Sequence, residues 1–454
     1  MSDTTRARLT QGNINRKLFD MTWPMVFGLM GITMFNLVDT YFIGQLGVLQ
    51  LAAIGFTFPV ITLINSLAVG IGIGASAVLS RVIGRGDEHR AARITTDSLI
   101  LAVLLGLFLT TVGILTIEPV FRLIGADDQV MPYIRQYMQI WYIGTIFVTV
   151  PMTGNNCIRA TGDTRTPALV MMFSGALNGV LDYLLIFGIG VFPELGMAGA
   201  ALATVIGRMV TLVFALLILG RREKLLTMES CTWSERRAIW GDVMTVGVPS
   251  ALTRVVQPLA FSVLTAFLAS FGNRVVAGYG VASRIEMFSL IFLNSMATIL
   301  APLGGQNYGA SEFGRIRRLF ATSVRVSILQ GLVLFAVFMA FGQSIAGLFT
   351  DEKDVMMETV RYLRIVSLGY IFYGIMQFGA SLLNVMDRPR TAAMLLLFQM
   401  FGLCLPLAYI GKILLGPSGI YLSLALSWVG SAMLSQLLFR RHLRILEESQ
   451  SESS

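Results

Sequence analysis

Long apolar segments alternate with short polar connections along the whole chain. An apolar helix of about 20 residues is long enough to cross the hydrocarbon core of a membrane. Segments of this kind lie at 18–43, 52–79, 94–118, 132–154, 166–189, 196–219, 240–270, 275–303, 320–346, 358–384, 391–411 and 418–439. The pattern therefore predicts an all-α polytopic membrane protein with twelve transmembrane helices.

Composition and charge support this interpretation. The 454 residues are 55% hydrophobic and only 13% charged, whereas soluble globular chains are roughly 25% charged. Basic residues cluster in the N-terminal tail, in the even-numbered connections and after the last span, while the odd-numbered connections hold only Arg122, Arg274, Lys353 and Lys412. By the positive-inside rule the basic side is cytoplasmic. We expect an inner-membrane protein with both termini in the cytoplasm, and its net charge of +8 reflects this topology rather than a nucleic-acid partner.

The sequence repeats itself at an offset of 225 residues. The repeat aligns Pro24 with Pro249, "GVLQLAAIG" (47–55) with "GNRVVAGYG" (272–280), and "YIRQYMQI" (133–140) with "ETVRYLRI" (358–365); near "LGMAGAAL" (195–202) and "LGPSGIYL" (415–422) the offset becomes 220. Six spans per half give both halves one orientation, as in transporters whose halves are related by a pseudo-twofold axis along the membrane normal. We expect a tail (1–17), an N-terminal six-helix lobe (18–219), a cytoplasmic linker (220–239), a C-terminal six-helix lobe (240–439) and a second tail (440–454).

Charged side chains inside membrane spans are costly and usually functional. Asp39 lies in the first span and Asp182 in the fifth, with Asn178 one helical turn before Asp182 on the same face. Two carboxylates and an amide oxygen suit a hard cation such as Na⁺, and neighbouring carboxylates also retain a proton more readily than one alone. Purely structural roles stay open for each residue. Asp39 could face water at a helix end, Asp182 could form a buried ion pair with Arg208, and Asn178 could simply form a hydrogen bond between two helices.

Several motifs together are similar to those of the multidrug and toxic compound extrusion (MATE) family: "LVDTYFIGQLG", "NGVLDYLLIFG", "GAALAT" and "APLGGQNYGA". The resemblance implies an antiporter that expels organic cations in exchange for inward H⁺ or Na⁺. It also implies that Asp39, Asn178 and Asp182 form the cation site of the N-terminal lobe, which would hold Na⁺ if the coupling is to sodium. Thr204 matches a threonine that helps to ligate the ion, and Pro24 matches a proline at which the first helix bends.

The C-terminal half departs from this pattern. Leu264 and Leu407 stand at the repeat positions of Asp39 and Asp182, and Gln257 stands where one branch of the family carries an acidic residue. The absence of an acidic residue at position 257 favours a resemblance to the DNA-damage-inducible efflux branch of the family, whose members are commonly proton-coupled.

Residues that could line a substrate cavity are Phe35, Tyr183, Gln257, Tyr279 and Glu286, although Glu286 could instead pair with Arg254, Arg284 or Arg325. The chain contains no metal-ligand cluster, phosphate-binding loop or nucleophile–base pair, so we expect a transporter and not an enzyme. It would need no cofactor besides the transported H⁺ or Na⁺, and one chain would suffice for function. A flippase for a lipid-linked substrate is the alternative, and a simple channel is a third possibility.

Overall fold

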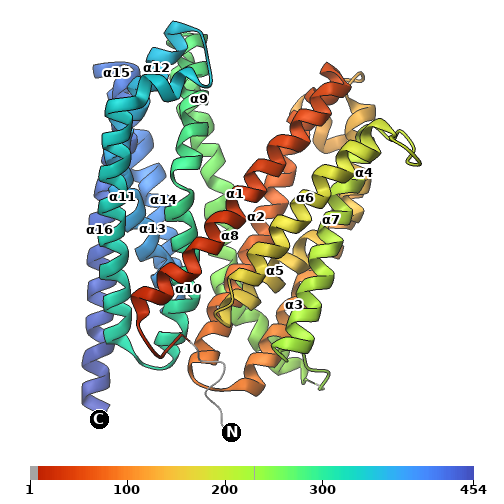
Figure 1. The fold of residues 1–454 in the computed structure, drawn as a ribbon. Helices are drawn as coiled ribbons and strands as arrows, with labels where there is room; N and C mark the ends of the chain where they lie inside the picture. Colours follow the sequence, from red (N-terminus) through yellow and green to blue (C-terminus); the bar gives the residue numbers. More distant parts are fainter. Residues whose placement is uncertain (1–8, 230, 454) are drawn as a thin grey trace. The chain divides into compact units, whose positions relative to one another are not determined.

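A computed structural model describes residues 9–229 and 231–453 (Figure 1). The described chain divides into two compact units. Unit 1 comprises Trp23–Ala251, and unit 2 comprises Leu9–Thr22 together with residues 252–453. Both boundaries fall inside long helices, one residue before Pro24 and two residues after its repeat partner Pro249. The predicted lobes, which follow the sequence repeat, stay a prediction.

Unit 1 is built from helices throughout. They are α1 (Ile14–Leu46, in unit 1 from Trp23), α2 (Val48–Gly84), α3 (Glu88–Ile124), α4 (Met131–Ile143), α5 (Ile146–Ala160), α6 (Arg165–Phe187), α7 (Met197–Leu217), the π-helical turn η1 (Ile218–Arg222) and α8 (Trp233–Ala269, in unit 1 as far as Ala251).

Unit 2 is also helical. After the second part of α8 come α9 (Asn273–Ser289), α10 (Ile291–Gly309), α11 (Phe313–Gly347), α12 (Lys353–Val366), the 3₁₀ turn η2 (Ser367–Gly369), α13 (Tyr370–Val385), α14 (Pro389–Leu397), the π-helical η3 (Phe398–Cys404), α15 (Leu405–Leu415) and α16 (Pro417–Ser453).

The helices lie in the predicted spans, and two of these spans, 132–154 and 275–303, are each divided between two helices. Within the described residues, ten helices are long and apolar enough to cross a membrane, and α9 with α10 forms an eleventh candidate bent by 47°. The predicted span 132–154 is divided between α4 and α5, of 13 and 15 residues, with Gly144 and Thr145 between them. Each piece alone is shorter than the bilayer core requires, so this span is broken.

Corresponding turns in the two halves share their geometry. Gly47, between α1 and α2, has φ +139°, and Gly272, between α8 and α9, has φ +107°. L-residues with a side chain rarely adopt either conformation. The glycine pair that aligns in the repeat therefore makes the same kind of helix–helix turn twice.

Small residues allow helices of unit 1 to pack closely. A Cβ added to Gly74 of α2 would lie 2.2 Å from the backbone oxygen of Val243 in α8, and one added to Gly70 would lie 2.6 Å from Cβ of Ala251. Glycines four residues apart lie on one face of a helix, and membrane helices pack through such faces. Gly70 and Gly74 thus set the contact between α2 and the first part of α8.

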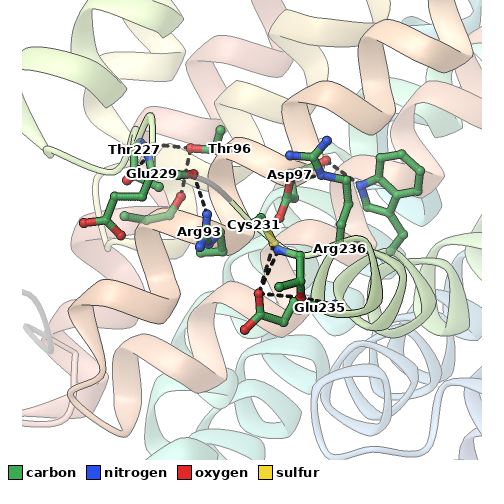
Figure 2. Close-up of polar contacts among 11 residues, drawn as sticks. Arg93, Thr96, Asp97, Thr227, Glu229, Cys231, Glu235 and Arg236 are labelled. Atoms are coloured by element: carbon green, nitrogen blue, oxygen red, sulfur yellow. Dashed lines mark hydrogen bonds and ion pairs between the residues drawn. The ribbon is translucent and has the colours of Figure 1, made fainter.

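The segment between α7 and α8 is held against α3 by polar contacts (Figure 2). The Thr227 amide donates to Oγ1 of Thr96 at 3.1 Å, and Arg93 Nη1 donates to the Glu229 carbonyl at 2.7 Å. Arg236 Nε donates to Oδ1 of the buried Asp97 at 3.0 Å. The expected linker is therefore packed on unit 1 along its described residues.

Candidate cation-coupling site

The site begins with the contact between α1 and α6 in unit 1. A Cβ added to Gly175 of α6 would lie 1.8 Å from the ring of Phe35 in α1, and one added to Gly179 would lie 3.7 Å from Val38. Because glycines at these positions leave room for the Phe35 ring, the two helices approach closely. Asp39 follows Phe35 by one turn, and Asp182 follows Gly175 by two turns, so each acid lies on the contacting face of its helix.

Asp39 and Asp182 lie close enough to interact with each other. Asp182 is fully buried, and its carboxyl group lies within interaction range of that of Asp39. Both oxygens of Asp182 and Oδ1 of Asp39 have no hydrogen-bond partner among the described residues. Buried charges normally have a partner because desolvation is expensive. A carboxyl pair of this kind therefore favours a bound proton or cation.

Three neutral side chains, those of Asn178, Thr204 and Tyr137, are connected to one another near the acids. Nδ2 of Asn178 lies 3.5 Å from Oγ1 of Thr204 in α7, and the buried Tyr137 phenol of α4 is within hydrogen-bonding reach of Thr204. Ser174 holds α6 against α7 by donating to the Gly207 carbonyl at 2.6 Å. Tyr137 therefore links the Asn178–Thr204 pair to the two aspartates, since its phenol lies near both acids as well as near Thr204. That Asp39, Asn178, Asp182 and Thr204 form one cation site stays a prediction.

Sequence reasoning missed Tyr137. It lies in the segment "YIRQYMQI", whose repeat partner "ETVRYLRI" places Tyr362 at the same position. In unit 2, Tyr362 donates to Oε2 of Glu286 at 2.7 Å. A tyrosine at one repeat position therefore faces acidic side chains in both units, and its recurrence in the repeat was the available signal.

The alternative pairings can be compared with the contacts. Among the described residues no ion pair within 4.0 Å joins Asp182 to Arg208 or Glu286 to an arginine. Glu286 instead accepts hydrogen bonds from two phenols, those of Tyr362 and of Tyr370 at 3.1 Å. Phenol hydrogen bonds therefore stabilise the Glu286 carboxyl group, and no arginine among the described residues forms an ion pair with it.

The candidate cavity residues fall into two groups. In unit 1, Phe35 packs against α6. The exposed Tyr183 ring packs in a tilted arrangement against the Phe42 ring, with the ring centroids 5.9 Å apart. In unit 2, Gln257 is exposed, whereas Tyr279 is buried against Tyr362 with ring centroids 5.6 Å apart. Pro24 lies inside α1, which is helical on both sides of it.

The donor set of the site consists of oxygens. Two carboxylates, an amide, a hydroxyl and a phenol suit a proton or a hard monovalent cation. Among the described residues, no group of three or more His, Cys, Asp or Glu side chains could hold a metal ion. Sodium at this site would therefore depend on Asp39 and Asp182 with neutral oxygens completing its coordination.

The sequence matches the model of a known protein family. The family model described as MatE matches residues 24–184 and again 249–410. The two matches begin 225 residues apart, which is the offset of the internal repeat. Both aspartates of the site lie in the first match.

Individual relatives cover nearly the whole chain. A "FAD transporter" of Shewanella oneidensis is 36% identical over 422 residues, which are 93% of each chain. A "Multidrug export protein MepA" of Staphylococcus saprophyticus is 24% identical and covers 96% of both chains. The crystal structure of the Vibrio cholerae MATE transporter VcmN in the bent form has a TM-score of 0.90 with 29% identity, covering 98% of this chain and 99% of that one. The all-α fold of two six-helix bundles is thereby confirmed.

Proposed function

The chain belongs to the MATE family of transporters, and we propose that it is a secondary active antiporter that exports amphipathic organic cations in exchange for inward H⁺, or Na⁺ in its place. It would work by alternating access as a single chain in the inner membrane, with both termini cytoplasmic. Support for the substrate class comes from relatives named as multidrug exporters. Support for the topology comes from the distribution of basic residues.

The observation that carries the proposal is the Asp39–Asp182 pair. Three of its four oxygens, Oδ1 of Asp39 and both of Asp182, lack hydrogen-bond partners among the described residues. A proton or cation from outside would therefore stabilise the pair. Loading this ion would remove the negative charge that holds an organic cation. Each ligand would thus favour a different state, and the gradient of one would drive export of the other.

Pro24 supplies a place for the accompanying movement. A proline inside a helix removes one backbone hydrogen bond and lowers the resistance to bending. The division of α1 between the two units falls one residue before Pro24. Repacking of the α1 segment that carries Asp39 would then follow ion loading, with the bend near Pro24.

Flavin adenine dinucleotide (FAD) is a second candidate substrate. The observation that favours it is the 36% identity to the FAD transporter across 93% of both chains. FAD carries phosphates, so its export would require basic groups, and Arg208, Arg254, Arg284 and Arg325 lie in the predicted spans. The Asp39–Asp182 pair would keep its role in ion coupling in this case.

A single experiment tests the ion coupling and separates the substrates. Proteoliposomes with an imposed pH gradient and no sodium would be supplied with either ethidium or FAD, each followed by its fluorescence. Asp39→Asn keeps the shape of the side chain but removes its charge and proton. We expect gradient-driven flux of one substrate in the native protein and a loss of at least ten-fold in the variant.

The matched control is Asp20→Asn, which changes an exposed aspartate of the same helix that pairs with Arg16 at 3.7 Å. It should transport as the native protein does. Gradient-driven flux that persists in Asp39→Asn would contradict the proposed coupling. Absence of native flux for both substrates, even with sodium restored, would favour the lipid-linked flippase instead.

A further inference from the structure

A basic groove lies in unit 2 between the first turns of α11 and the second half of α16. It has a volume of about 470 Å³ and is lined by Arg317, Phe320, Ala321, Val324, Arg325, Gln436, Phe439, Arg440, Leu443 and Arg444. On each helix these residues occupy positions i, i+3, i+4, i+7 and i+8, starting from Arg317 on α11 and from Gln436 on α16, so each set lies on one helix face. Four arginines therefore point into one space from two helices.

The positive charge of this groove is only partly neutralised. Glu447 pairs with Arg317 at one end. Among the described residues, no ion pair within 4.0 Å involves Arg325, Arg440 or Arg444, and all three are exposed. Eight residues of helix separate Arg317 from Arg325, so the charges extend over roughly 12 Å along α11.

One wall of the groove is apolar. The rings of Phe320 and Phe439 stack with centroids 4.1 Å apart, and both are almost fully buried, as is Leu443. Val324 continues this wall along α11. A ligand of the whole groove would therefore combine an anionic group with an apolar part.

The internal repeat shows that these charges are not a general consequence of topology. At the corresponding positions of the first half, Ala92 stands for Arg317, Ile100 for Arg325 and Gly220 for Arg440, while Lys224 keeps the charge of Arg444. Both halves have the same predicted orientation, and the positive-inside rule applies equally to both. The concentration of arginines is thus specific to the α11–α16 groove.

We propose that this groove binds one anionic phospholipid of the cytoplasmic leaflet. The guanidinium groups of Arg325 and Arg440 would hold the phosphodiester, since arginine forms paired hydrogen bonds with phosphate oxygens. An acyl chain would lie along Ala321 and Val324, the accessible apolar residues of the groove, beside the buried Phe320 and Phe439 rings. Basic pockets between membrane helices on this side are typical sites for anionic headgroups, and a soluble phosphate would leave the apolar wall without a partner.

The test measures phospholipid bound to the purified protein by native mass spectrometry. Delipidated protein in detergent would be titrated with palmitoyl-oleoyl phosphatidylglycerol or with the zwitterionic phosphatidylcholine of the same chains. We expect one phosphatidylglycerol to bind at least ten-fold more tightly than phosphatidylcholine. The double variant Arg325→Gln with Arg440→Gln should lose this preference.

Arg318→Gln with Arg441→Gln is the matched control. It removes the same charge from the same two helices at exposed positions that do not line the groove. This control should retain the preference for phosphatidylglycerol. Equal losses in both double variants would show general electrostatic attraction and would overturn the proposal.

Two further measurements complete the test. Inorganic phosphate added in excess should not displace phosphatidylglycerol, because it lacks the acyl chain; displacement at concentrations equal to the lipid would identify a phosphate site and overturn the lipid assignment. Melting temperatures in lipid-free detergent should agree among the native protein and both variants. A groove variant that melts with the native protein and still prefers phosphatidylglycerol would also refute the site.

Discussion

The ion pair between Asp97 of α3 and Arg236 of α8 is expected to anchor the segment between the two halves (Figure 2). Asp97 is only 1% exposed, and the Arg236 side chain is 31% exposed. Trp240 also donates from Nε1 to the Asp97 carbonyl at 3.0 Å. Replacing Arg236 by methionine keeps much of the side-chain volume but leaves a buried carboxylate without its cation.

The expected magnitude follows from the 3.0 Å distance between Nε of Arg236 and Oδ1 of Asp97. With an effective dielectric constant near 20, unit charges at this distance attract by about 5.5 kcal/mol. Desolvation offsets part of this attraction, and breaking a buried pair costs about 3–5 kcal/mol. Because water reaches Arg236, we expect Arg236→Met to lower the free energy of unfolding by about 3 kcal/mol.

A double-mutant cycle separates the pair from other effects. Asp97→Asn keeps an acceptor for the guanidinium and removes the buried charge, so it should cost about 1–2 kcal/mol. In the double variant the neutral amide no longer needs a cation. The two changes together should then cost about 2 kcal/mol less than the sum of the single changes.

The assays are equilibrium unfolding in detergent and hydrogen exchange of residues 224–229. Exchange in this segment should rise in Arg236→Met before the core of unit 1 opens, because local opening needs less free energy than global unfolding. Arg237→Met is the control, since Arg237 is an exposed neighbour. A cost below about 0.5 kcal/mol for Arg236→Met, equal to that of the control, would refute the reasoning.

Two further predictions concern unit 1. Gly74→Ala places a Cβ 2.2 Å from the Val243 carbonyl and should lower the free energy of unfolding by about 3 kcal/mol, measured by unfolding in detergent, whereas Gly55→Ala, with no atom within 4 Å of the new Cβ, should be neutral or stabilising. Burial raises the pKa of Asp163, but hydrogen bonds from a neighbouring threonine and the Arg222 guanidinium outweigh it and hold that pKa below its usual 3.8. Its contribution is therefore present above the unfolded-state pKa of about 3.9 and is lost as pH falls through the lower folded-state value. Melting temperatures of the native protein and Asp163→Asn should accordingly differ at pH 7 and converge only below about pH 4, and a constant difference would contradict this.

Sequence alone determined the features that depend on one segment at a time. The length of an apolar segment decides whether it can cross a membrane, so the spans and the all-α fold could be predicted. The cost of a charge in a span is equally local, and it singled out Asp39 and Asp182. The repeat aligned Gly47 with Gly272, and the structure then showed that both have a positive φ between consecutive helices, a conformation that favours glycine.

The tertiary structure decided what depends on the rotation and approach of several helices. The place of Tyr137 beside Thr204, the break between α4 and α5, and the gathering of four arginines in one groove could not be predicted from apolar length or charge. In a membrane every helix is apolar on most faces, so hydrophobicity does not indicate which face meets which neighbour. Contacts are chosen instead by small residues that allow close approach, such as Gly175 against Phe35, and their effect exists only once both helices are in place.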